Sequence, residues 1–185
     1  MKFSKRIILA SASPRRREIL DSMGLTFDVM PTNSDESVVK AKCPRTLVKR
    51  LSALKADAIE DENAIVIGAD TVVAFRGEVF GKPRSIEEAA AMLKRLGGHW
   101  HSVYTGVTLK CGKDEICFSA RSRVKIKSLS DEEIASYFAA SNPLDKAGAY
   151  GIQDGRVVQK YSGSYTNIVG LPKEKLAKAL ARVGI

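Results

Sequence analysis

The sequence predicts an α/β protein with a mixed sheet, and two patterns lead to that fold class. Short apolar runs alternate with segments of helical periodicity, which is typical of strands and helices that pack against one another. Some strand-like runs also face each other across a short turn, as at Gly112-Lys113, and such hairpins add antiparallel strands to a sheet. The length of 185 residues favours one domain, or one core with two lobes.

Three apolar runs in the first half of the chain predict strands. They lie at residues 6–10, 26–30 and 64–75. The third run is the longest, and we expect an interruption at residues 68–70, where a glycine, an alanine and an aspartate stand together. Arg76-Gly77 then predicts a turn into a short strand over residues 78–80.

Two helices are predicted between these strands. Pro14 suits the first position of a helix with Ser13 as its N-cap, and Gly24 is expected to end that helix after Met23. A polar loop over residues 31–39 follows the second strand, and Pro44 opens the next helix. Four side chains at helical spacing predict its apolar face: Leu47, Leu51, Leu54 and Ala58.

The second half of the chain predicts helices, a long hairpin and a specific loop. Ser85 with Glu88, and Ser130 with Glu133, match the capping-box pattern at a helix start. Alternating residues predict strands over 100–109 and 116–126. The remaining expectations are a loop over 144–155, a hairpin over 156–169 that turns near residues 162–163, and a closing helix over 173–183.

Composition and charge exclude several classes of protein. With 44% hydrophobic and 28% charged residues the chain is globular, and its net charge of +9 admits nucleic acid, anionic membrane or phosphorylated ligands. The three cysteines match no zinc motif, and His99 and His101 lack further ligands nearby. Neither a signal peptide nor a membrane span is indicated, so we expect free thiols in a cytoplasmic protein.

The sequence SASPRRR at residues 11–17 places three arginines on the first turn of a helix. Cations are unfavourable at this end, because the helix dipole and the free N–H groups attract anions. Arginine grips phosphate oxygens in bidentate fashion, so a bound polyphosphate would resolve the conflict. Successive residues diverge by about 100° on a helix, so not all three arginines can reach one ligand. The alternative is a solvated basic turn.

The sequence IGADTVV at residues 67–73 places Asp70 in a strongly apolar strand. A buried carboxylate is costly unless it is paired, hydrogen-bonded or bound to metal. Gly68 and Ala69 leave room for something to approach, and Asp70 is a candidate metal ligand or general base. The alternative is a structural aspartate at a strand bulge. Asp35-Glu36 becomes a candidate Mg²⁺ ligand pair if a polyphosphate binds nearby.

The sequence DKAGAYGIQ at residues 145–153 has two glycines that let backbone approach a ligand, and a glutamine amide that can bind a base edge. A structural loop is the alternative. Together these segments resemble the Maf family of nucleoside triphosphate pyrophosphatases, and the resemblance covers essentially the whole chain. The matching segments are SASPRR (11–16), GADTVV (68–73), GKP (81–83), DKAGAYGIQ (145–153) and VGLP (169–172).

The resemblance implies an elongated α/β fold like that of inosine triphosphate pyrophosphatases, with a mixed sheet flanked by helices and a central cleft. One Maf-like domain would cover residues 1–185, with two lobes around that cleft. Asp70 would be the proton acceptor, and Glu36 and Asp70 would hold a divalent metal, Mg²⁺ or Mn²⁺. The remaining site residues implied are Arg15, Thr71 and Gln153 for base preference, and Ser13, Arg16, Lys55, Lys82 and Lys146 for phosphates.

The ADT and YGIQ segments are similar to the dTTP/UTP subfamily, which implies hydrolysis of dTTP and UTP to the monophosphate and pyrophosphate. Such an enzyme would limit non-canonical or modified nucleotides, with a link to cell-division arrest left open. Alternatives are the same reaction on CTP, 7-methyl-GTP or a modified nucleotide, and a non-catalytic nucleic-acid-binding or division regulator. Aromatic residues are only 6% and basic residues are scattered, so we expect no stable nucleic-acid partner and no membrane. The sequence leaves open whether the chain forms a homodimer.

Overall fold

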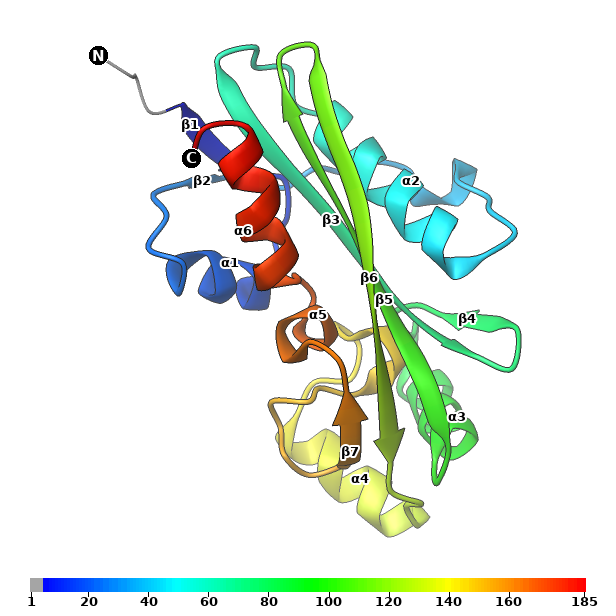
Figure 1. Ribbon diagram of the computed structural model, residues 1–185. Coiled ribbons are helices and arrows are strands. Elements are labelled where there is room, and N and C mark those ends of the chain that lie inside the picture. Colours follow the sequence, from blue (N-terminus) through cyan, green and yellow to red (C-terminus); the bar gives the residue numbers. More distant parts are fainter. Residues whose placement is uncertain (1–4) are drawn as a thin grey trace. The chain divides into compact units, whose positions relative to one another are not determined.

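The computed structural model describes residues 5–185 and has a mixed α/β fold, as the sequence predicts (Figure 1). Its strands are β1 (Arg6–Leu9), β2 (Asp28–Val29), β3 (Ala64–Phe75), β4 (Glu78–Phe80), β5 (Trp100–Cys111), β6 (Asp114–Ile126) and β7 (Val158–Ser162). Its α-helices are α1 (Pro14–Asp21), α2 (Pro44–Asp57), α3 (Ile86–Leu96), α4 (Asp131–Ala140), α5 (Tyr165–Val169) and α6 (Lys173–Arg182). Two 3₁₀ helices, η1 (Glu36–Val38) and η2 (Ala147–Ala149), lie in loops.

The strands of the described residues form one seven-stranded sheet in the order β2-β1-β3-β5-β6-β7, with β4 paired to β3. Strand β1 is parallel to both β2 and β3. In contrast, β4 runs antiparallel to β3, and β7 runs antiparallel to β6. The sheet is therefore mixed. Segments that contain helices connect the parallel strands, a short turn connects β3 to β4, and β7 pairs with β6 only after α4 and η2.

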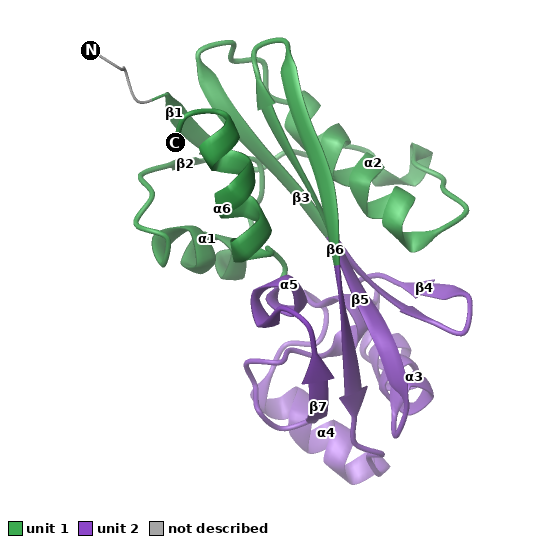
Figure 2. Cartoon of the chain, viewed as in Figure 1, with its two compact units in different colours: residues 1–70, 105–120, 170–185 green, residues 71–104, 121–169 purple. Residues whose placement is uncertain are grey.

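The chain divides into two compact units (Figure 2). Unit 1 contains Met1–Asp70, Thr105–Ala120 and Gly170–Ile185, and unit 2 contains Thr71–Tyr104 and Arg121–Val169. The long strands β3, β5 and β6 each contribute residues to both units.

In unit 1, helix α2 packs directly on the backbone of the sheet. A Cβ atom at Gly68 would lie 2.1 Å from the carbonyl oxygen of Ser52, and one at Gly106 would lie 2.1 Å from that of Val48. Any side chain at either glycine would push the helix off the sheet. Gly68 therefore leaves room for the backbone of α2, and this helix is what approaches the strand next to Asp70.

The buried face of α2 also differs from the predicted one. Its buried residues are Val48, Leu51, Ser52 and Ala56. Leu47 and Leu54 are only partly buried, and Ala58 is exposed. Relative to the predicted orientation the helix is rotated about its axis, because small or β-branched residues must lie opposite the two glycines of the sheet. In this orientation Ser52 also forms a hydrogen bond to Thr108 at 2.8 Å.

Unit 2 has its own apolar core between its helices and the strands β5 and β6. Its members come from α3, α4, the strands and the loop around η2: Val73, Phe80, Ala89, Met92, Leu93, Leu96, Val103, Val124, Ile126, Ile134, Tyr137, Ala149, Tyr150 and Val157. Gly148 has a φ of +70° and lies against Val73, so a Cβ there would be 2.9 Å from Val73 Cγ2. Its backbone approaches the core and not a ligand.

Four local predictions need correction. The helix predicted to reach Met23 ends at Asp21, and the strand predicted over residues 26–30 is only the two-residue β2. The strand over residues 64–75 continues without interruption through Asp70. The capping box at Ser130 is complete, but only half of the one at Ser85 forms. The Ser85 hydroxyl accepts a hydrogen bond from Glu88 N–H, whereas the Glu88 carboxylate accepts one from Arg84 N–H and not from Ser85 N–H.

A fifth correction concerns residues 156–169, which form β7 and helix α5 in place of a hairpin. Ser164 starts the helix, because its Oγ accepts from the N–H of Asn167 at 3.2 Å, as an N-cap serine does. Asn167 is fully buried and donates to Val103 O and Ser122 Oγ. These bonds hold α5 as a helix against β5 and β6.

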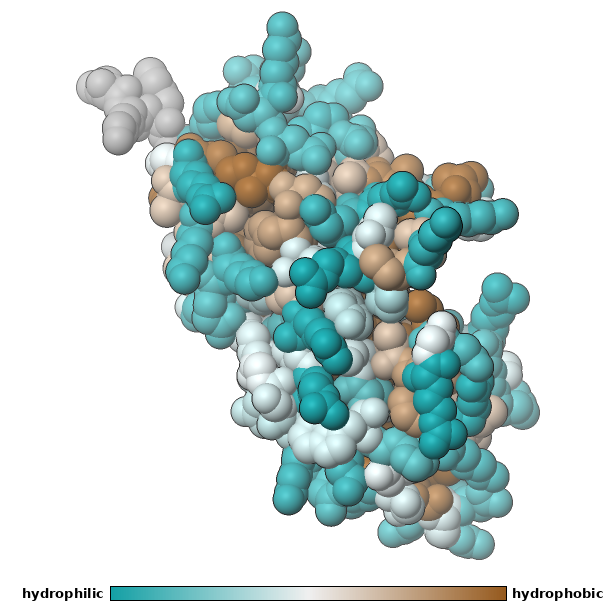
Figure 3. Space-filling view, turned by 45° about the vertical axis from the view of Figure 1, so that its right-hand side comes forward, coloured by the Kyte–Doolittle hydropathy of each residue, from teal (hydrophilic) through white to brown (hydrophobic). Residues whose placement is uncertain are grey.

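Hydrophilic side chains cover much of the face shown in Figure 3, with small apolar patches between them. No helix among the described residues has the length and apolar content needed to cross a membrane. Cys43, Cys111 and Cys117 are all free, and Cys43 is exposed whereas Cys111 is buried.

Candidate active site

The turn between β1 and α1 uses its three arginines differently. Arg15 is half-buried, Arg16 is buried and Arg17 is exposed, so the three side chains diverge as helix geometry requires. Ser13 is the N-cap residue, but its side chain makes no capping bond. Its N–H donates to Ser11 Oγ at 3.3 Å.

Arg16 joins two segments that are distant in the sequence. Its Nη1 donates to Ser11 Oγ at 2.9 Å, and its Nε donates to the carbonyl of Gly170 at 3.0 Å. Burial lowers the pKa of Arg16, and the positive charge of Arg15 lowers it further. The negative charges of Asp70 and Glu36 act in the opposite direction. Arg16 therefore fixes the loop after β1 and places a buried positive charge within the field of both carboxylates.

A lysine on α2 lies between two carboxylates. Lys55 Nζ is 2.6 Å from Asp70 Oδ1 and 2.9 Å from Glu36 Oε1. The Asp70 and Lys55 side chains are 10% and 14% exposed, whereas Glu36 is 52% exposed. The buried carboxylate is thus compensated by one buried ammonium, and Glu36 completes the group from the surface side. We call Glu36 and Asp70 the carboxylate pair.

Asp35 and Glu36 have separate tasks, which the sequence alone did not distinguish. The Asp35 carboxylate caps η1 by accepting from Ser37 N–H at 2.9 Å and Ser37 Oγ at 2.6 Å. These bonds lower the pKa of Asp35. Since Asp35 is committed to the turn, Glu36 is the member that reaches Lys55.

The carboxylate pair fits a divalent cation in its donor chemistry. The Lys55 ammonium is a cation that both carboxylates already contact, so one ion can reach both. Mg²⁺ commonly takes one or two carboxylates from a protein and completes its shell with water and phosphate oxygens. The described residues contain no cluster of three or more acidic, histidine or cysteine ligands, so the protein alone offers two ligands at most here.

In unit 2, the predicted site residues lie on loops that are tied together. Lys82 is exposed just after β4, and the carbonyl of Gly81 accepts from Gly148 N–H at 3.0 Å. Lys146 Nζ donates to Asn142 O at 2.6 Å and to Asp145 Oδ1 at 3.0 Å. The bond between Gly148 and Gly81 holds the two lysine-bearing loops of unit 2 next to each other, and the two Lys146 bonds lie within its own loop.

Gln153 and Thr71 complete the predicted set. Gln153 is exposed, and Thr71 is half-buried and follows Asp70 directly in β3. The loop before Gln153 is fastened by Tyr137, whose hydroxyl donates to Asp154 Oδ2 and accepts from Gly151 N–H. Sequence reasoning missed Tyr137 and Asp154, because nothing in the α4 pattern sets one aromatic residue apart.

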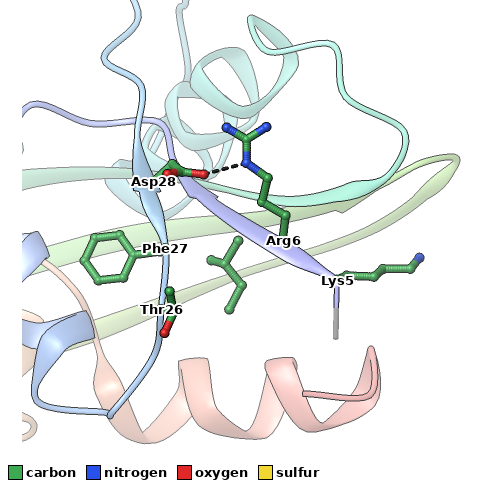
Figure 4. A pocket seen from close by; sticks show the side chains of 6 residues that line it. Lys5, Arg6, Thr26, Phe27 and Asp28 are labelled. Carbon is green, nitrogen blue, oxygen red and sulfur yellow. Dashed lines mark hydrogen bonds and ion pairs between the residues drawn. The ribbon is translucent and has the colours of Figure 1, made fainter. Parts of the chain in front are cut away.

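Unit 1 also has a small pocket beside the start of β1 (Figure 4). Its volume is about 200 Å³, and it is lined by Lys5, Arg6, Ile7, Thr26, Phe27 and Asp28. Arg6 is already paired with Asp28 there. Ligands of parallel sheets bind at the carboxyl ends of the strands, where Ser11 lies, so we assign no nucleotide to this pocket.

A family model described as Maf-like protein matches residues 6–183. A protein of Thermosipho africanus named dTTP/UTP pyrophosphatase is 49% identical over 173 residues, which are 92% of this chain and 90% of that protein. A protein of the same name from a Geobacillus species is 42% identical over 185 residues, 97% of this chain and 99% of that protein.

Two solved structures share the fold at low sequence identity. The Staphylococcus aureus Ham1 protein matches with a TM-score of 0.54 and 14% identity, over 98% of this chain and 100% of that one. A HAM1 protein from Coxiella burnetii matches with a TM-score of 0.54 and 13% identity, over 97% and 100%.

Proposed function

The chain belongs to the Maf-like protein family, and from that premise we propose that it is a nucleoside triphosphate pyrophosphatase acting on dTTP and UTP. The observation that carries the assignment is its 40–49% identity, over at least 92% of the chain, to proteins named dTTP/UTP pyrophosphatase. The lysine-bridged carboxylate pair beside a buried arginine supports the same chemistry, because it joins a water-activating group to cations that attract phosphates.

In the proposed reaction, Asp70 orients a water molecule and accepts its proton. The water oxygen forms a bond to the α-phosphorus, and the bond from that phosphorus to the bridging oxygen breaks. The electrons of that bond leave with pyrophosphate, and the nucleoside monophosphate remains. Lys55 contacts Asp70 through Oδ1, so Oδ2 is the oxygen that would accept the proton of the water.

We propose that the carboxylate pair holds a divalent cation, Mg²⁺ or Mn²⁺. When bound, this ion would offset the negative charge of the triphosphate. Lys55 would then have to leave at least one carboxylate, and its ammonium would turn to a phosphate oxygen. Ser13, Arg16, Lys82 and Lys146 are the further phosphate-binding residues of the proposal.

Arg15, Thr71 and Gln153 are the proposed determinants of base preference. A threonine hydroxyl and a glutamine amide can match the donor and acceptor groups of a pyrimidine edge. A site of this kind rejects a mismatched base strongly, because its polar groups then lose their partners. The exposed position of Gln153 leaves its amide accessible to a ligand. We propose that the enzyme works on free nucleotides in the cytoplasm.

The test is pyrophosphate release from a panel of dTTP, UTP, CTP, ITP and 7-methyl-GTP, with Mg²⁺, with Mn²⁺ and with chelator. We expect metal-dependent release concentrated on dTTP and UTP. Asp70→Asn should lower turnover by about 10²- to 10⁴-fold, the range of general-base catalysis. Asp57→Asn is the matched control, since Asp57 forms an ion pair with Lys110 on the surface. Release from another nucleotide would overturn the base assignment, and full activity of Asp70→Asn would remove Asp70 from the mechanism.

A further inference from the structure

One side of the sheet in unit 2 carries basic and aromatic side chains and no helix. The other side holds the core, where Val103, Val124 and Ile126 pack against α3 and α4. In Figure 2 these helices lie behind β5, β6 and β7. The opposite side, which we call the open face, consists of Trp100, Tyr104, Arg121, Arg123, Lys125, Lys160 and Ser162, with Ser102 buried among them.

Strand pairing and side-chain contacts bring these residues together. Lys160 pairs with Lys125, and Ser162 pairs with Arg123, so each pair lies on one side of the sheet. Arg121 Nε donates to Ser102 Oγ at 3.1 Å. The open face therefore runs across three strands, although its members are scattered over some sixty positions of the sequence.

The charge of the open face is uncompensated. Its four cations are Arg121, Arg123, Lys125 and Lys160, and none of them makes an ion pair with any residue of the described range 5–185. The strand segments 100–104, 121–126 and 158–162 contain no aspartate or glutamate. Four like charges on one small surface repel one another, and a polyanion would relieve that repulsion.

The aromatic rings of the open face are held by arginines. The Arg123 guanidinium lies 5.0 Å from the centroid of the Trp100 ring, and that of Arg121 lies 5.7 Å from the Tyr104 ring. Trp100 remains 38% exposed. Rings and guanidinium planes that alternate on a sheet are surfaces on which unpaired bases stack, while neighbouring cations contact the phosphates.

We propose that the open face binds single-stranded nucleic acid, weakly and with little sequence preference. Cations two residues apart along β6 repeat every ~6.6 Å, a spacing that suits successive phosphates of an extended strand. A duplex keeps its bases stacked internally and cannot use Trp100. The proposal uses no residue of the candidate active site and does not rest on the proposed function. It adds a surface that the scattered basic residues of the sequence concealed.

Trp100 is the only tryptophan of the chain, so its fluorescence reports on this face alone. We would titrate the full chain with labelled oligodeoxyadenylate and follow both anisotropy and Trp100 quenching. Adenine avoids the proposed pyrimidine site, and excess dTMP should leave binding unchanged. We expect dissociation constants of about 10⁻⁴ to 10⁻⁶ M and, for four phosphate contacts, a slope of log K against log salt near −3.

The double variant Arg121→Gln/Arg123→Gln should bind the oligonucleotide at least tenfold more weakly and halve the slope of log K against log salt. Its pyrophosphate release should be unchanged. Lys178→Gln/Arg182→Gln removes the same charge from exposed positions of α6 and should change affinity less than twofold. A duplex of the same length, and vesicles of anionic lipid, should quench Trp100 less. Binding without Trp100 quenching, equal loss in both double variants, or tighter binding of duplex or vesicles would overturn the proposal.

Discussion

Replacing Lys55 by methionine is expected to destabilise the protein, because the carboxylate pair loses its shared counter-ion. The ammonium lies 2.6 Å from the nearly buried Asp70 and 2.9 Å from the half-exposed Glu36. Removing one partner of a buried ion pair costs about 3–5 kcal/mol, whereas an exposed pair contributes less than about 1 kcal/mol. Asp70 keeps some exposure, so we expect a loss of about 3 kcal/mol in the free energy of unfolding.

Urea denaturation and thermal melting in the presence of chelator measure this loss. In a protein of this size 1 kcal/mol shifts Tm by about 2–4 °C, so Lys55→Met should lower Tm by roughly 6–12 °C. Lys49→Met is the matched control on the same helix and should change stability by less than about 0.5 kcal/mol. In an Asp70→Asn background the Lys55 substitution should cost much less, because a neutral amide needs no counter-ion.

Mn²⁺ provides a second readout of the same substitution. If the ammonium occupies the position of a cation, Mn²⁺ should raise the Tm of Lys55→Met more than that of the wild type. The reasoning is refuted if Lys55→Met melts within about 2 °C of the wild type, or if it loses as much stability in the Asp70→Asn background.

Two further predictions concern the scaffold. Gly68→Ala should destabilise by more than about 2 kcal/mol, because its Cβ would meet Ser52 O at 2.1 Å, whereas Gly81→Ala, with open space around it, should be near neutral in the same denaturation assay. Burial lowers the pKa of His101 to about 4. The unfolded chain therefore protonates His101 at a higher pH than the folded protein does. As pH falls from about 6.5 toward 4, the free energy of unfolding decreases by at most about 3 kcal/mol. In His101→Gln this part of the pH dependence should vanish, and an unchanged slope of stability against pH would contradict it.

Much of the fold follows from local patterns in the sequence. The bounds of β3 and the turn at Arg76-Gly77 match the prediction, because an apolar β-branched run and a glycine at positive φ determine their own conformation. Residues 156–169 were mispredicted, since the conformation of α5 depends on the burial of Asn167 against β5 and β6. Asn167 lies 64 positions from Val103 and 45 positions from Ser122 in the sequence, and contacts over such separations leave no local pattern.

In the candidate site, too, some features follow from local sequence patterns and others depend on contacts between distant residues. Asp70 stands out in the sequence because a carboxylate interrupts an apolar run, and the structure places it beside Lys55. The sequence could not say that Lys55 also reaches Glu36, because that contact depends on the loop before α2. It also could not say that Gly68 accommodates a helix, since a glycine in a strand serves a ligand or a neighbouring backbone equally well.

The position of bond cleavage tests the central claim most directly. Hydrolysis of dTTP in ¹⁸O-labelled water, followed by ³¹P NMR of the products, shows which phosphorus the water attacks. We predict dTMP and pyrophosphate, with the label in dTMP alone. Label in pyrophosphate, or products that are dTDP and phosphate, would contradict attack at the α-phosphorus and with it the proposed arrangement of Asp70 and the cations around the triphosphate.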